Sequence, residues 1–298
     1  MNYPHPYVDI ESLALPNRVL LIYGPRQVGK TTLLKQFLSK TSLKFRLDTG
    51  DNIKMHHILG SGDLDQILEY SLGYELIAID EAQRIPGIGL ALKILVDNRP
   101  DLRLIATGSS SFELAGQVGE PLTGRKKTVT LFPLAQCELI SMYTPHEIKG
   151  QLTERLVFGS YPAVMKAEGK ASKAILLSEL VESYLLKDIL ELERVKSSKV
   201  LLDLLRLIAF QVGSEVSLSE LGQQIGLDYK TVARYLDLFE KAFVLYNLRG
   251  FSRNLRSEIT QKGKYYFFDN GIRNAVISNF NDIGIRNDVG VLWENFIF

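Results

Sequence analysis

Eight residues near the start of the chain combine glycines, a lysine and a threonine at a spacing that could bind phosphate groups. Gly24 and Gly29 permit backbone angles that let successive N–H groups wrap around an anion. Lys30 can reach the β- and γ-phosphates of a nucleotide, and the Thr31 hydroxyl can bind Mg²⁺. The residues expected to hold the nucleotide are Gly24, Pro25, Arg26, Gln27, Val28, Gly29, Lys30, Thr31 and Thr32.

The residues on either side of this loop predict the elements that position it. An apolar run at 18–23 is typical of a buried strand, and the apolar spacing over 32–38 is helical. The N-terminus of a helix adds a partial positive charge that favours a bound anion. We therefore predict that the loop binds ATP together with Mg²⁺.

A second apolar run, at 75–79, ends in two carboxylates. Asp80 would hold Mg²⁺ and its water shell, and Glu81 could polarise water for attack on the γ-phosphate. The alternative is a strand whose acidic end only meets solvent. Because the loop lies upstream, we favour catalytic roles for Glu81 and Lys30 and metal binding by Thr31 and Asp80.

A third predicted strand, at 102–106, runs into a turn rich in serine and glycine. A hydroxyl at its end would lie between the two motifs and could sense the γ-phosphate, so Thr107 and Ser109 are both candidates. An ordinary polar turn accounts for either residue almost as well.

The composition agrees with an intracellular enzyme. The 298 residues are 46% hydrophobic, enough for two or three cores, and the net charge of +1 makes no prediction about charged partners. The single cysteine, Cys137, excludes an internal disulfide framework and fits a reducing compartment. The first residues lack the pattern of a signal peptide, and no apolar run is long enough to span a bilayer. We expect a cytoplasmic protein without membrane association.

The pattern of elements separates three regions. Alternating strand and helix patterns over 1–134 predict an α/β fold, a P-loop NTPase core with a parallel sheet. A helical lid or linker is expected over 135–196, with one long helix at 171–195 whose apolar stripe serves packing. A winged-helix domain is expected over 197–276.

Three helices and a hairpin are predicted in the third region. The helices are expected at 200–210, 217–226 and 229–240, and the strands at 243–246 and 265–268. Capping residues set the limits of the second helix and the start of the third. Short turns between such helices are typical of a helix-turn-helix arrangement.

Basic residues collect on the last of these helices and between the two strands. From residue 226 to residue 275 there are nine Lys or Arg against five acidic residues. This excess suggests contacts with the phosphates of double-stranded DNA through Lys230, Arg234, Arg253 and Arg256. A charged helix face can also be merely solvated, and such modules also bind proteins, so a protein partner stays open.

Seven segments carry motifs in a specific combination: 22–32, 79–83, 106–110, 122–125, 131–134, 159–162 and 268–273. In this combination the chain resembles prokaryotic AAA-type ATPases (AAA+ superfamily) that pair an ATPase core with a C-terminal winged helix. Those proteins often end in a further, nuclease-like domain. The resemblance implies ATP hydrolysis with Mg²⁺, coupled to rearrangement of the winged helix, and is compatible with a homo-oligomer.

The resemblance also implies a role for Arg125. In such ATPases a Gly-Arg pair after the sensor strand supplies positive charge near the phosphates. The resemblance therefore implies that Arg125 is the arginine finger, acting on the nucleotide of its own subunit or of another subunit. The alternative is a surface charge beside Lys126 and Lys127.

Two features of the sequence depart from the pattern of these ATPases. Ser160 stands where relatives usually have a second glycine, and the chain stops within an apolar helix start, so we expect 277–298 to begin a truncated C-terminal domain.

Three other functions fit parts of the pattern. A GTPase needs a base-reading Asn-Lys-x-Asp, but the nearest string, at 98–101, lacks the lysine and precedes its strand. A P-loop kinase is possible, although Glu81 beside Asp80 favours water as the acceptor. The main competitor is a nucleotide-gated DNA-binding or scaffold protein with negligible turnover.

Overall fold

The computed structural model describes residues 5, 8–109, 122–185, 189–190, 198–250 and 263–298. The chain folds as two compact units, Met1–Phe132 (unit 1) and Pro133–Phe298 (unit 2). Each unit has its own buried core, so each is described by itself.

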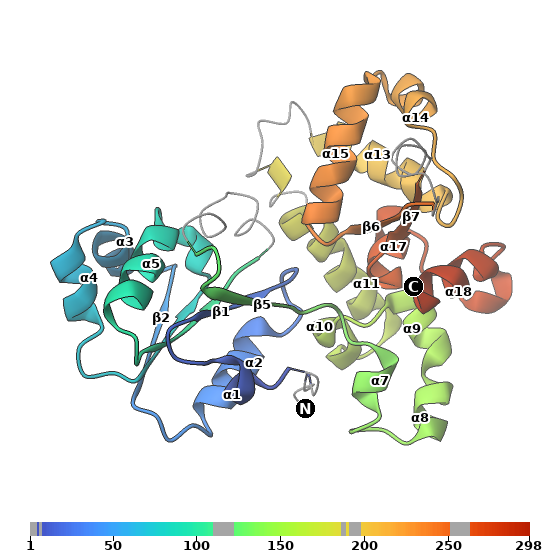
Figure 1. Ribbon diagram of the computed structural model, residues 1–298. Helices are drawn as coiled ribbons and strands as arrows, with labels where there is room; N and C mark the ends of the chain where they lie inside the picture. Colours follow the sequence, from blue (N-terminus) through green and yellow to red (C-terminus); the bar gives the residue numbers. More distant parts are fainter. Residues whose placement is uncertain (1–4, 6–7, 110–121, 186–188, 191–197, 251–262) are drawn as a thin grey trace. The chain divides into compact units, whose positions relative to one another are not determined.

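Unit 1 is built on a five-stranded, wholly parallel sheet with the order β2-β3-β4-β1-β5 (Figure 1). The strands are β1 (Val19–Tyr23), β2 (Phe45–Thr49), β3 (Leu76–Asp80), β4 (Arg103–Thr107) and β5 (Lys126–Thr130). The central strands are almost fully buried, which explains their continuous apolar runs. The expected α/β fold with a parallel sheet is confirmed.

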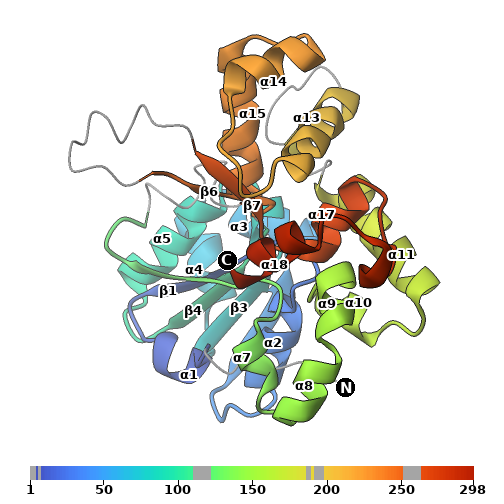
Figure 2. The ribbon, with the colours of Figure 1, turned by 90° about the vertical axis from the view of Figure 1, so that its right-hand side faces the viewer.

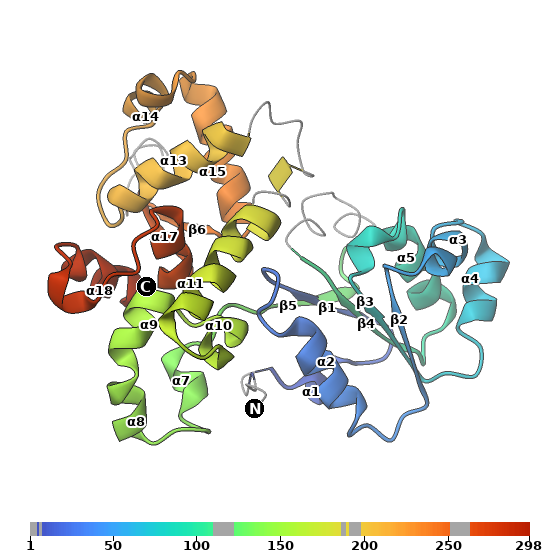
Figure 3. The same ribbon diagram turned by 180° about the vertical axis from the view of Figure 1, so that it is seen from behind.

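Helices cover both faces of this sheet (Figures 1 and 3). They are α1 (Ile10–Leu13), α2 (Lys30–Leu38), α3 (Ile53–Leu59), α4 (Leu64–Tyr70), the 3₁₀ turn η1 (Ala82–Arg84) and α5 (Ile88–Asn98). Because β4 lies between β1 and β3, the carboxyl ends of these three strands are neighbours at one edge of the sheet. Ligands of open α/β sheets bind at this edge.

Unit 2 begins with a series of helices, most of them short. They are α7 (Gln136–Leu139), α8 (Pro145–Gly150), α9 (Leu152–Phe158), α10 (Pro162–Lys166), α11 (Lys170–Glu179) and the π-helical segment η2 (Leu180–Leu185). Together α11 and η2 account for the first part of the long helix expected at 171–195. Leu177 and Leu180 are buried, as the apolar stripe predicts, and 186–188 and 191–195 lie outside the described residues.

Three helices and an antiparallel hairpin follow (Figure 2). They are α13 (Ser198–Phe210), α14 (Leu218–Ile225), α15 (Tyr229–Lys241), β6 (Leu245–Leu248) and β7 (Lys264–Phe267). The predicted caps are confirmed, since Ser217 and Asp228 accept N–H groups at the starts of α14 and α15, and Gly226 ends α14 with φ 69°. An isolated bridge joins Glu215 to Lys264 and extends the hairpin.

The last helices also belong to unit 2. They are α17 (Asn270–Val276), the 3₁₀ turn η3 (Ile283–Ile285) and α18 (Val289–Ile297). Asn295 of α18 accepts the Phe267 N–H at 2.7 Å and donates to the Phe267 carbonyl at 3.0 Å, as a neighbouring strand would. Helix α18 therefore packs on the β6–β7 hairpin.

A buried carboxylate explains two of the sequence motifs. Asp269 accepts the N–H of Ser160 at 2.6 Å and that of Ile272 at 3.1 Å. A Cβ at Gly159 would lie 2.0 Å from the Asp269 carboxylate, so this close approach needs glycine. Burial raises the pKa of Asp269 to about 6. The segments 159–162 and 268–273 thus form one packing contact in unit 2.

A second buried cluster joins two arginines through one carboxylate. Asp288 accepts from Arg286 at 2.8 and 2.7 Å and also pairs with Arg273. The Arg286 and Arg273 side chains are 0% and 3% exposed. Hydrogen bonds from Arg286, with those from Arg273, lower the pKa of Asp288 to about 2. We call these three residues the Asp288 triad.

Candidate nucleotide-binding site

The predicted phosphate-binding loop connects β1 to α2 at the carboxyl edge of the sheet. Three of its residues have positive φ: Gly24 at 141°, Gln27 at 64° and Gly29 at 107°. A Cβ at Gly24 would lie 2.1 Å from the carbonyl oxygen of Leu131, so only glycine fits there. Gly29 is the N-cap of α2, which places the positive end of that helix in the loop.

Lys30, the first residue of α2, is buried against the loop, with 4% of its surface exposed. Its Nζ donates to the carbonyl oxygens of Gly24 at 2.8 Å and Pro25 at 2.9 Å. A positive charge is therefore held inside the loop that a polyphosphate would approach.

Side chains from α2, β3 and β4 meet beside the loop. Thr31 Oγ1 donates to Asp80 Oδ2 at 2.8 Å, and the Thr107 hydroxyl donates to Asp80 Oδ1. Thr107 Oγ1 also accepts the N–H of Glu81 at 3.3 Å. The structure thus brings together the residues predicted to hold the metal and one of the two predicted sensors.

The donors at this point fit Mg²⁺, which prefers hydroxyl, carboxylate and phosphate oxygens. Thr31 and Asp80 offer two such groups on adjoining elements. Within the described part of the chain, no group of three or more His, Cys, Asp or Glu could hold a metal ion. Mg²⁺ usually keeps several waters and binds phosphates beside one or two protein ligands, so an ion at Thr31 and Asp80 would take further ligands from phosphate and water.

Glu81 has a left-handed backbone, with φ 49° and ψ 42°. Its carboxylate accepts from Gln83 Nε2 at 2.6 Å, and the same amide nitrogen donates to Ser109 Oγ at 3.2 Å. Gln83 lies in a motif that the sequence analysis recognised, but no role was predicted for it. An amide two residues after the carboxylate predicted to be catalytic was the available signal.

A cavity of about 380 Å³ lies beside Thr31 and Asp80 and extends toward β2. One of its lining residues, Asp48, accepts from Arg46 Nε at 2.6 Å and from the Tyr70 hydroxyl at 2.9 Å. Burial, with the nearby Asp48 carboxylate, raises the pKa of Tyr70. The site therefore has open space on the β2 side of the metal-binding residues.

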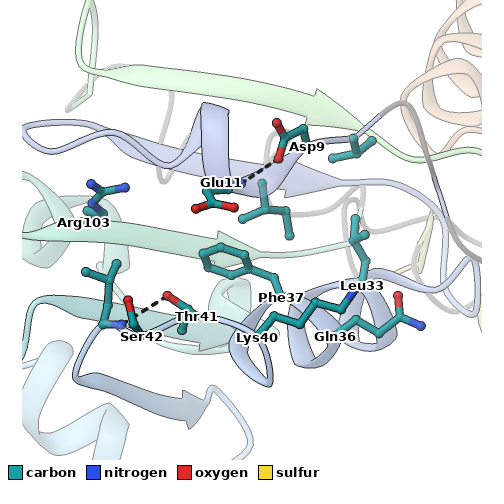
Figure 4. Close-up of a pocket in the computed structure, with 12 residues that line it drawn as sticks. Asp9, Glu11, Leu33, Gln36, Phe37, Lys40, Thr41, Ser42 and Arg103 are labelled. Atoms are coloured by element: carbon teal, nitrogen blue, oxygen red, sulfur yellow. Dashed lines mark hydrogen bonds between the residues drawn. The ribbon is translucent and has the colours of Figure 1, made fainter.

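A larger cavity of about 530 Å³ lies elsewhere in unit 1 (Figure 4). Its lining includes Glu11 of α1, Phe37 and Lys40 near the end of α2, and Arg103 at the start of β4. None of the predicted site residues lines it. It lies at the opposite end of α2 from Lys30, so the structure gives no reason to place phosphates in it.

Arg125 lies at the wrong edge of the sheet for a finger acting in its own chain. Its carbonyl oxygen accepts the N–H of Val19, where β1 begins, whereas the loop follows the end of β1. The length of that strand, roughly 16 Å at 3.3 Å per residue, separates the two positions. The Arg125 guanidinium pairs with Asp97 of α5. A contact from a neighbouring copy stays a prediction.

The basic residues of the third region are only partly available for a ligand. Lys230 and Arg234 are exposed on α15. Lys241 pairs with Asp237 at 2.8 Å, and Arg273 is buried in the Asp288 triad. Arg253 and Arg256 lie outside the described residues. The local charge excess counted along the sequence therefore overstates the charge offered by α15.

Two family models match separate parts of the chain. Residues 16–140 match an AAA domain, and residues 149–283 match a domain of unknown function (DUF8612). The first match covers the parallel sheet and the loop described above. Fold, loop and family match together define unit 1 as an AAA-like P-loop domain.

Relatives resemble the chain over most of its length. An uncharacterized protein of Mycobacterium tuberculosis is 27% identical over 94% of this chain and 61% of its own length. One from Haemophilus influenzae is 25% identical, over 87% of this chain and 69% of its own length. The chain thus spans less than two thirds of the mycobacterial relative.

A solved structure, the Walker-type ATPase of Pyrococcus abyssi, shares the fold. It superposes with a TM-score of 0.52 at 18% identity, over 87% of this chain and 91% of its own. The similarity therefore extends into both units. At this identity it supports a common fold and does not identify an activity.

Proposed function

We propose that the protein binds ATP with Mg²⁺ in unit 1 and hydrolyses it. One observation carries the proposal: Thr31 Oγ1 and the Asp80 carboxylate meet at 2.8 Å, beside the buried Lys30. A hydroxyl and a carboxylate joined next to a phosphate-binding loop are what a nucleotide-bound Mg²⁺ requires. The AAA domain match over 16–140 supports the same function.

Each residue of the site has a proposed role. The loop and Lys30 bind the β- and γ-phosphates, and Thr31 and Asp80 hold Mg²⁺, which neutralises phosphate charge. Glu81 orients the attacking water, while the hydroxyls of Thr107 and Ser109 respond to the γ-phosphate. Arg125 would act only from a neighbouring copy in a homo-oligomer.

Steady-state release of phosphate from ATP tests this proposal most directly. We expect turnover with Mg²⁺ and none after chelation by EDTA, because the metal-binding residues act only through the ion. The assay is run with and without duplex DNA. ATP binding without phosphate release under either condition would favour the alternative, a nucleotide-gated scaffold.

Lys30→Ala should weaken ATP binding on the order of 10-fold to 100-fold, since it removes the charged donor facing the β- and γ-phosphates. Isothermal titration calorimetry measures the affinity. Lys40→Ala, two residues beyond the far end of the same helix, is the matched control and should bind like the parent. Equal affinity of Lys30→Ala and the parent would contradict the assignment of the loop.

We also propose that α13, α14, α15 and the β6–β7 hairpin form a winged-helix module that contacts double-stranded DNA. The order of three helices and a hairpin supports the module. The exposed Lys230 and Arg234 lie in the first turns of α15, and that part of a recognition helix enters a major groove.

Lys230→Glu combined with Arg234→Glu should abolish DNA binding through lost contacts and new repulsion. Fluorescence anisotropy with duplex DNA at two salt concentrations measures it, and parent binding should weaken steeply with salt. The control, Lys93→Glu with Lys149→Glu, changes the charge equally at exposed positions of α5 and α8, outside this module. Circular dichroism checks the fold. If the parent protein does not bind duplex DNA at low salt, the result would favour a protein partner for this module.

A further inference from the structure

The backbone of Glu81 is fixed on both sides. Its N–H donates to Thr107 Oγ1, and its carbonyl oxygen accepts the N–H of Arg84 at 3.1 Å, which closes η1. A Cβ at Gly50 would lie 2.1 Å from this carbonyl oxygen, so the end of β2 packs directly against it. A left-handed non-glycine residue persists only when its surroundings hold it, and such residues cluster at functional sites.

Among the described residues, the side chain that holds the carboxylate of Glu81 is that of Gln83. Gln83 Nε2 donates one hydrogen bond to Glu81 Oε2 at 2.6 Å and another to Ser109 Oγ at 3.2 Å. An amide nitrogen has two hydrogens, so both bonds form at once. Gln83 therefore links the proposed catalytic carboxylate to the end of β4, where the proposed sensor lies.

The other end of this amide is unsatisfied. Gln83 Oε1 is buried, and no hydrogen-bond partner for it exists among the described residues. A buried acceptor without a partner lowers stability, and each such group in a native protein requires an explanation. The stability that the two hydrogen bonds of Gln83 contribute is therefore at least partly offset at position 83.

We propose that Gln83 is a positioning residue that aims the Glu81 carboxylate at the attacking water and couples that aim to Ser109. The inference rests on the proposed ATPase activity. A general base must hold its orientation to act, because loss of a near-attack geometry is costly even when binding is intact. Nucleotide affinity should depend little on Gln83, since the phosphate-binding loop and Lys30 supply it.

Gln83→Met separates this role from packing, because methionine keeps the length and volume and removes the amide. We expect kcat to fall on the order of 10-fold to 100-fold, the effect of one hydrogen bond to a charged group. KM for ATP should change less than about 3-fold, as expected when an interaction acts after substrate binding. The melting temperature should change little, because the loss of two hydrogen bonds and the removal of the unsatisfied acceptor act in opposite directions.

Gln66→Met, at an exposed position of α4, is the matched control and should leave kcat, KM and the melting temperature unchanged.

A double variant tests the coupling to Ser109. Ser109→Ala should lower kcat in the parent, and it should lower kcat by a smaller factor in the Gln83→Met background, because both changes act through one amide. Parent-like kcat in Gln83→Met, a kcat loss with a lower melting temperature, or fully additive losses would each overturn the inference. A parent without turnover would instead overturn the proposed function, on which the inference rests.

Discussion

Glu81→Gln is expected to lower ATP hydrolysis on the order of 10²-fold or more while ATP stays bound. The substitution keeps the shape of the side chain and its ability to hydrogen-bond, but removes the carboxylate that orients water. Binding should survive because the loop, Lys30 and Thr31 are unchanged. Phosphate release and calorimetric ATP affinity are measured on the same preparation.

Glu75→Gln is the matched control for this change. Glu75 precedes β3, at the opposite end of that strand from Asp80, and its carboxylate accepts the N–H of Lys44 at 2.8 Å. The Glu75→Gln variant should therefore hydrolyse ATP like the parent. Turnover that persists in Glu81→Gln would show that another residue orients the water.

Asp288→Ala is expected to lower the free energy of unfolding of unit 2 by about 3–5 kcal/mol. It leaves the two guanidinium groups of the Asp288 triad buried without their carboxylate, and Arg286 is 0% exposed. The midpoint of urea unfolding measures the loss. Asp282→Ala breaks an exposed ion pair with Lys170 and should cost under about 1 kcal/mol. Similar losses for both variants would contradict a structural role for the triad.

The Asp288 triad also predicts how the free energy of unfolding of unit 2 changes at acid pH. The pKa of Asp288 is about 2 in the folded protein, below its ordinary value of 3.8. The stabilisation is therefore complete above pH 3.8 and is lost as the pH falls through about 2. The urea midpoints of the parent and of Asp288→Ala should converge over this interval. A difference between them that stays constant would rule out this contribution from Asp288.

Local patterns in the sequence were enough to predict the loop and much of the fold. A buried parallel strand reads as one apolar run, so β1, β3 and β4 were found within a residue or two. Ser217, Gly226 and Asp228 set helix ends through their own backbone neighbours, and the structure has those ends where expected.

Features that depend on distant parts of the chain were not predictable in this way. The hydrogen bond between Ser160 and Asp269 joins positions 109 apart. Arg125 belongs to a Gly-Arg motif, but only the parallel pairing of β5 with β1 shows that it lies where β1 begins, whereas the loop follows the end of β1. In the sequence, Gln83 is a polar residue after a strand with nothing to distinguish it from its neighbours. Only the structure shows its amide hydrogen-bonded to both Glu81 and Ser109.

The contacts of α17 have a consequence for the order in which the protein folds during its synthesis. Asn274 donates to the carbonyl oxygens of Leu156 and Val157 across 118 and 117 positions, and all of α17 is buried. Unit 1 has every strand once residue 130 has left the ribosome. Helices α9 and α11 must wait for about 110 and about 90 further residues, respectively, before the helix that covers them is made. We therefore expect unit 2 to fold late and in one step, exposing apolar surface to chaperones meanwhile.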